Sequence, residues 1–89
     1  MLNLALIYGG QSSEHSVSCV TALGVLSAVD TAKYRVLQIG ITKSGKFVQH
    51  QIQADWKLSQ YPEVPESAEP VSFLPGSNSV RLALSLIHI

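Results

Sequence analysis

A glycine pair, Gly9 and Gly10, ends a nearly continuous apolar run over residues 2–8 and leads into a polar stretch over residues 11–16. Such a run is typical of a parallel strand that is covered on both faces. Residues 17–29 then have the composition and spacing of a helix. Strand, glycine turn and helix in this order predict an α/β fold with an open parallel sheet.

The glycine turn is also the first candidate for a ligand site, because ligands gather at the carboxyl ends of parallel strands. Residues 9–18 lack both the G-x-G-x-x-G spacing and a Gly-Lys-Ser/Thr triplet, so neither a dinucleotide fingerprint nor a P-loop is predicted. Glu14 falls at the start of the helix, where the helix dipole keeps a carboxylate ionised and suited to hold a cationic group such as an ammonium. The alternative is a favourable first-turn acid, with Ser12 or Ser13 as the N-cap.

The helix carries an apolar stripe that we expect to pack on the sheet, formed by Cys19, Ala22, Leu23, Leu26 and Val29. Val17 falls opposite the centre of this stripe, one turn beyond Glu14. It either lines a small pocket against a substrate methyl group or packs under a loop or an absent domain. His15 lies nearer the stripe, and a hydrogen-bonded structural role is favoured over that of a general base.

Residues 9–18, Val25-Leu26 and residues 40–46 resemble the N-terminal domain of the D-alanine–D-alanine ligase family over about the first half of the chain. The family commonly has an acid where this chain has Ser16. The resemblance implies an incomplete, Rossmann-like domain over residues 1–79, of the kind that precedes an ATP-grasp region. The ATP-grasp regions themselves are absent from this sequence.

The resemblance also implies roles for individual residues. Glu14 would anchor the ammonium of the first D-alanine, and Val17 would contact its methyl group. Ser18 would belong to the same substrate site and tie the start of the helix to neighbouring groups. The turn that shapes the site would consist of Gly9, Gly10, Ser12 and Ser13.

The implied reaction is the ATP-dependent formation of D-alanyl-D-alanine for peptidoglycan synthesis. ATP with Mg²⁺ (or Mn²⁺) activates one D-alanine as an acyl phosphate, which the amino group of a second D-alanine attacks. No residue of this chain is expected to perform bond chemistry, to bind nucleotide or to bind metal, so the fragment alone is expected to be inactive. A homodimer is one option for the full-length enzyme.

Charge and composition narrow the remaining functions. Six Lys and Arg residues balance six Asp and Glu residues, so nothing attracts the chain to nucleic acid or to an anionic membrane. The single cysteine, Cys19, cannot form an internal disulfide. Met1 leads directly into the apolar run without a basic segment, and no apolar run is long enough to span a bilayer. These features predict a cytoplasmic protein.

The rest of the chain is less regular. Residues 34–41 predict a second strand, parallel to the first, and residues 46–50 predict a short strand in a hairpin with residues 39–43. Lys43 and Lys46 beside that turn are expected to be solvated charges, and Trp56 an anchor over the sheet edge. We expect a loop over residues 58–79, and over residues 80–89 either a third parallel strand or a non-native tail.

Two other functions fit the same residues. One is a small stand-alone α/β module that binds its own ligand at the Glu14 turn. The other is a helper subunit that docks on a larger catalytic chain through its exposed sheet edge.

Overall fold

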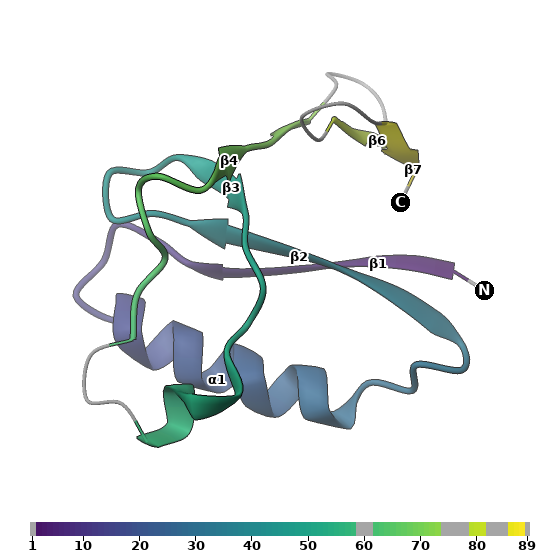
Figure 1. Cartoon of the computed structure of the whole chain (residues 1–89), viewed down its shortest axis with the longest axis horizontal. Helices are drawn as coiled ribbons and strands as arrows, with labels where there is room; N and C mark the ends of the chain where they lie inside the picture. The colour runs from purple at the N-terminus through teal and green to yellow at the C-terminus, as the bar shows by residue number, and fades with distance from the viewer. Residues whose placement is uncertain (1, 59–61, 74–78, 82–85, 89) are drawn as a thin grey trace.

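A computed structural model of the chain describes residues 2–58, 62–73, 79–81 and 86–88. Figure 1 shows the elements along the chain. They are β1 (Leu2–Gly9), α1 (His15–Ala28), β2 (Tyr34–Ile41), β3 (Phe47–Gln49), the 3₁₀ helix η1 (Ala54–Leu58), β4 (Glu69–Pro70), β5 (Ser72–Phe73), β6 (Ser79–Arg81) and β7 (Leu86–His88).

The first four strands form one sheet in the order β1-β2-β3-β4. β1 and β2 pair in parallel from Leu2 opposite Tyr34 to Gly9 opposite Ile41, with α1 as the crossover between them. This confirms the predicted α/β unit. β3 adds antiparallel to β2, as the predicted hairpin requires, and β4 adds antiparallel to β3, so the sheet is mixed. The physical reason is the short turn over residues 42–46, which allows only the antiparallel return of a hairpin.

The last three strands form a separate antiparallel sheet in the order β5-β6-β7. The predicted loop over residues 58–79 contains short strands among its described residues, namely β4, β5 and the first residue of β6. Of the two alternatives for residues 80–89, the third parallel strand is wrong for the described residues, which belong to the antiparallel strands β6 and β7, and the non-native tail stays a prediction. β6 and β7 follow each other too closely for the crossover of roughly a dozen residues that parallel pairing requires. Strands of two or three residues also leave no periodic pattern in the sequence.

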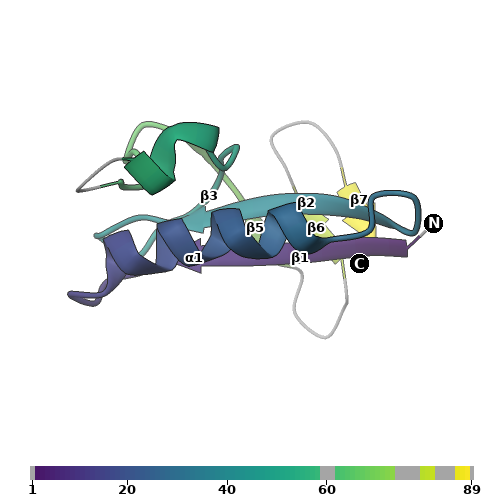
Figure 2. The ribbon, with the colours of Figure 1, turned by 90° about the horizontal axis from the view of Figure 1, so that it is seen from below.

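The helix covers one face of the first sheet, along β1 and β2 (Figures 1 and 2). Cys19 and Ala22 are buried against the sheet, and Leu23 and Leu26 pack on the same cluster. Four positions of the predicted stripe thus face the core. Val29, the fifth, lies just past the end of α1 as its C-cap.

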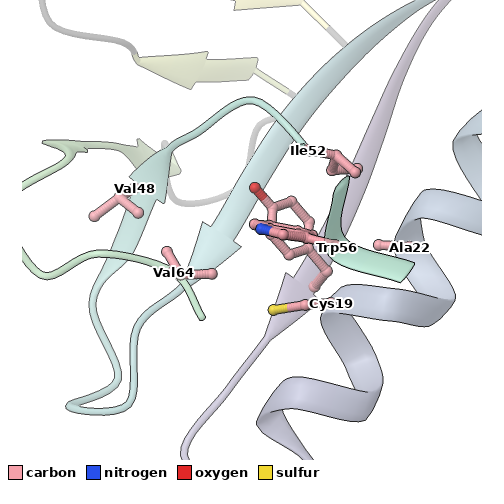
Figure 3. Close-up of a cluster of buried hydrophobic side chains, with 7 residues drawn as sticks. Cys19, Ala22, Val48, Ile52, Trp56 and Val64 are labelled. Carbon is pink, nitrogen blue, oxygen red and sulfur yellow. The ribbon is translucent and has the colours of Figure 1, made fainter. Parts of the chain in front are cut away.

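The core beside the helix is completed by residues that are far away in the sequence (Figure 3). Trp56 is 6% exposed and meets the ring of Tyr8 edge-on at a centroid distance of 5.6 Å. It therefore lies inside the core cluster, whereas we predicted an anchor over the sheet edge. The remaining buried members of this cluster are Val48, Ile52 and Val64.

The opposite face of the sheet has a smaller core. Leu37 and Ile39 are buried there against Val71, and Phe73 meets Phe47 edge-on at 5.5 Å. β1 forms the edge of the described sheet, and three of its large apolar side chains remain exposed: Leu2 by 68%, Leu4 by 38% and Ile7 by 45%. In the described parts of the chain, no helix is long and apolar enough to cross a membrane.

Candidate functional site

The turn after β1 depends on glycine at its first position. Gly9 has a φ of +91°, and a Cβ atom there would collide with the carbonyl oxygen of Ile41 and lie 3.2 Å from Cε1 of His15. The N–H of Gly10 donates to the same Ile41 oxygen at 2.9 Å. The turn is therefore pressed against the carboxyl ends of both parallel strands, where the sequence predicted a site.

Gly10 differs from its neighbour in its surroundings. Its φ is +112°, yet a Cβ atom would meet nothing within 4 Å. This side of the turn is open.

The helix begins one residue later than the first-turn interpretation of Glu14 requires. Glu14 itself is the N-cap residue of α1, and its side chain makes no capping hydrogen bond. Ser12 supports this start, because its hydroxyl accepts from the N–H of Glu14 at 3.1 Å and its carbonyl accepts from the N–H of His15 at 3.2 Å. Neither Ser12 nor Ser13 is the N-cap, which corrects that prediction.

The carboxylate of Glu14 is left free by this arrangement. Glu14 is exposed, and among the described residues its side chain has no hydrogen bond or ion pair. A carboxylate near a helix N-terminus experiences the positive end of the helix dipole. It can accept a charge-assisted hydrogen bond from an ammonium group that enters from solvent.

Ser18 joins the helix to the turn. Its hydroxyl oxygen accepts from the N–H of Gly9 at 3.0 Å, one helical turn after Glu14. The predicted tie between the helix start and a neighbouring group is therefore present, and the group is a backbone amide of the turn. A contact of Ser18 with substrate stays a prediction.

Val17 does not pack into the core. It is 58% exposed and lines a shallow hollow of about 230 Å³ on the outer side of α1. The other described residues lining this hollow are Ser16, Val20, Thr21 and Pro62. An apolar surface thus lies one turn from Glu14, as the pocket interpretation of Val17 requires.

His15 is a buried structural residue, which confirms the favoured interpretation. It is 2% exposed, and its Nδ1 lies 2.7 Å from the carbonyl oxygen of Gly10. The N–H of Val64 donates to its Nε2 at 3.0 Å. A carbonyl needs a donor and an N–H needs an acceptor, so these contacts fix the neutral tautomer with hydrogen on Nδ1.

Residues 62–66 lie beside the site, and the sequence offered no sign of this. Lys43 pairs with Glu63 at 2.9 Å and Lys46 with Glu66 at 3.6 Å, and each of the four side chains is at least half exposed. The lysines are therefore solvated as predicted, and in addition they meet acids from a distant segment.

Hydrogen bonds strengthen this attachment. The hydroxyl of Ser44 donates to the Glu66 carboxylate at 2.6 Å, and this bond is the main reason that the pKa of Glu66 is lowered. The pKa of Glu63 is lowered as well, by its hydrogen bond and attraction to Lys43. Both acids hold residues 62–66 against the turn between β2 and β3.

The described residues offer no place for a metal ion, since none of them form a group of three or more metal-ligating side chains. Cys19 is fully buried, and its burial raises the pKa of its thiol to about 11. A thiol that stays protonated is a poor ligand and a poor nucleophile.

Comparison with known proteins finds that the chain is similar to D-alanine–D-alanine ligases. A family model described as "D-ala D-ala ligase N-terminus" matches residues 3–84. The D-alanine–D-alanine ligase of Paenarthrobacter aurescens is 49% identical over 72 residues, which are 78% of this chain and 19% of that protein. The ligase of Legionella pneumophila strain Corby is 40% identical over 74 residues, covering 82% of this chain and 20% of the relative.

A solved structure has the same fold. The VanG D-Ala:D-Ser ligase from Enterococcus faecalis superimposes on 98% of this chain with a TM-score of 0.76 and 23% sequence identity. The match covers 26% of that protein. This chain thus spans about a fifth of the length of the curated relatives that it matches.

Proposed function

The chain belongs to the D-alanine–D-alanine ligase N-terminal family, and from this premise we propose that it is part of an ATP-dependent ligase that forms D-alanyl-D-alanine for peptidoglycan synthesis in the cytoplasm. Its part in that enzyme is to help hold the first D-alanine. The regions that bind nucleotide and the second D-alanine belong to the larger share of the family enzyme that lies outside this sequence.

The observation that carries the proposal is the free carboxylate of Glu14. It stands at the N-cap of α1, beside the carboxyl ends of β1 and β2, and it is exposed without a partner among the described residues. The ammonium of D-alanine carries the opposite charge and can pair with this carboxylate. A charge-assisted hydrogen bond to it orients the amino acid with its methyl and carboxylate groups toward other parts of the site.

Two further residues support the same role. Val17 offers an exposed apolar side chain one turn along the same helix, suited to contact the methyl group of D-alanine. Ser18 holds the helix on the glycine turn through the N–H of Gly9, which keeps Glu14 in place. ATP with Mg²⁺ or Mn²⁺ would supply the activation of the substrate carboxylate.

The test is a chimera in which residues 3–84 replace the matching segment of the Paenarthrobacter aurescens ligase. Glu14→Gln should raise the KM for the first D-alanine and leave the KM for ATP nearly unchanged. Loss of a charge-assisted contact costs about 1.5–3 kcal/mol, or roughly ten- to a hundredfold in affinity.

Glu69→Gln is the matched control, because Glu69 is also exposed but lies in β4, away from the turn. It should change neither KM. If Glu14→Gln leaves the dependence of the rate on D-alanine unchanged, the assignment of Glu14 is wrong.

A docking module is the second candidate, and the apolar edge at β1 favours it. Leu2, Leu4 and Ile7 are exposed there, and an uncovered edge strand readily pairs with another chain. The 89-residue chain should be studied by size-exclusion chromatography and thermal unfolding. Cooperative unfolding supports an independent module, whether the chain is a monomer or pairs through β1, whereas a broad transition supports part of a larger enzyme.

A further inference from the structure

His15 connects two segments that are far apart in the sequence. Its Nδ1 meets the carbonyl oxygen of Gly10 at 2.7 Å, and its Nε2 accepts from the N–H of Val64 at 3.0 Å. The ring also lies close to Gly9, where a Cβ atom would come within 3.2 Å of Cε1. One imidazole therefore binds the glycine turn through Gly10 and residues 62–66 through Val64.

The two hydrogen bonds differ in burial. His15 and Val64 are both 2% exposed, and the bond between them is buried, whereas Gly10 is half-buried. Without the ring, the N–H of Val64 would lose its acceptor inside the core and the carbonyl of Gly10 would lose its protein donor, which is costly for backbone groups.

The position of Glu14 depends on the same turn. Gly10 is held at its N–H by Ile41 and at its carbonyl by His15. Two exposed hydrogen bonds follow along the chain, from the Gln11 side chain to the Ser44 carbonyl at 3.3 Å and from the N–H of Glu14 to the Ser12 hydroxyl. Among the described residues, the carboxylate of Glu14 has no hydrogen bond or ion pair to hold it. The location of Glu14 is therefore set by the backbone before and after it, and His15, the next residue in the chain, holds that backbone at Gly10.

We propose that His15 is a positioning residue for the first D-alanine site, acting through its Nδ1–H bond to the carbonyl of Gly10. This inference rests on the proposed function. His15 does not touch the substrate: it holds the turn so that Glu14 meets the ammonium group. The bond to Val64 contributes to stability and places residues 62–66, and it is not the contact that sets the affinity for D-alanine.

Two substitutions separate the two bonds. In His15→Asn the side-chain amide nitrogen takes the place of Nδ1 and can donate to Gly10, while Val64 loses its acceptor. In His15→Gln the amide oxygen takes the place of Nε2 and can accept from Val64, while Gly10 loses its donor. Both variants should lower the melting temperature, since each removes the hydrogen-bond partner of one backbone group.

Steady-state kinetics of the chimera distinguish positioning from mere stability. His15→Gln should raise the KM for D-alanine about five- to tenfold, and His15→Asn should restore it to within about twofold of the parent, with the KM for ATP unchanged in both. Equal KM values for D-alanine in the two variants would overturn the proposal, and so would a parallel rise in the KM for ATP.

Two controls keep this result separate from the proposed function. Glu14→Gln in the same chimera tests the function itself: if it raises the KM for D-alanine and the His15 variants do not differ, only the present inference fails. ¹⁵N NMR of the 89-residue chain at neutral pH needs no activity, and it should show His15 with hydrogen on Nδ1 and a bare Nε2. The opposite tautomer would overturn the geometry on which the inference depends.

Discussion

Gly9→Ala should destabilise the chain more than Gly10→Ala, although both glycines have a positive φ. The two positions have nearly the same backbone strain, with φ values of +91° and +112°. They differ in the room that each leaves for a Cβ atom. A Cβ atom at Gly9 would collide with the Ile41 carbonyl and come within 3.1 Å of the Val64 side chain, whereas at Gly10 it would meet nothing within 4 Å.

The magnitudes follow from this difference. A residue other than glycine at such φ values costs about 1–3 kcal/mol, and this applies to both variants. At Gly9 the colliding atom belongs to the backbone of β2, so relief requires the turn to move away from the strand. That movement adds a packing cost of about 1–3 kcal/mol and weakens the hydrogen bond from Gly10 to Ile41, worth about 0.5–1.5 kcal/mol.

The free energy of unfolding should be measured by urea denaturation, with melting temperatures as a second observable. An extra loss of 1 kcal/mol lowers the melting temperature by about 4–8 °C in a domain of this size. Gly24→Ala is the matched control, because Gly24 lies inside α1 with open space around it, and alanine there should stabilise the helix by about 0.5–1 kcal/mol. Equal losses for Gly9→Ala and Gly10→Ala would refute the steric argument.

Three further outcomes are expected. Val17→Ala in the chimera should let larger D-amino acids gain relative to D-alanine by about 1–3 kcal/mol, with little change in melting temperature because Val17 is 58% exposed; unchanged specificity with a lower melting temperature would make Val17 a packing residue. Cys19 is fully buried with its pKa raised to about 11, so iodoacetamide should label it only as fast as the chain unfolds, and labelling at the rate of a free thiol would contradict this. The lowered pKa of Glu66 means that its ionised form favours the fold, so its contribution to stability is present above the ordinary pKa of 4.5 and is lost as the pH falls through the lowered pKa. Glu66→Gln should therefore reduce the loss of melting temperature at acid pH, and an unaltered loss would contradict the Ser44 and Lys46 contacts.

Local order could be predicted from the sequence because its signals are local. The apolar run over residues 2–8 corresponds to β1, and the stripe through Cys19 and Ala22 corresponds to the buried face of α1. The hairpin between β2 and β3 followed from one turn signal at Ser44-Gly45. In each case the residues that decide the structure lie within a few positions of one another, so periodicity and turn chemistry suffice.

The candidate site was predicted in part for the same reason. Gly9, Gly10 and Glu14 lie within six consecutive residues, so their meeting at the end of β1 required only the strand, turn and helix. The identity of the N-cap was wrong, because an N-cap at Ser12 or Ser13 places the helix start one or two residues too early. A difference of that size decides whether Glu14 precedes the helix or belongs to it.

Tertiary structure decided the rest. His15, Lys43 and Lys46 each have a partner among residues 62–66, and no local pattern links those positions. The place of Trp56 in the core also depends on residues far away in the sequence. The antiparallel pairing of β5, β6 and β7 depends on which short segments lie side by side. A contact between residues tens of positions apart leaves no period in the sequence, because its energy is gained only after the chain has brought both partners together.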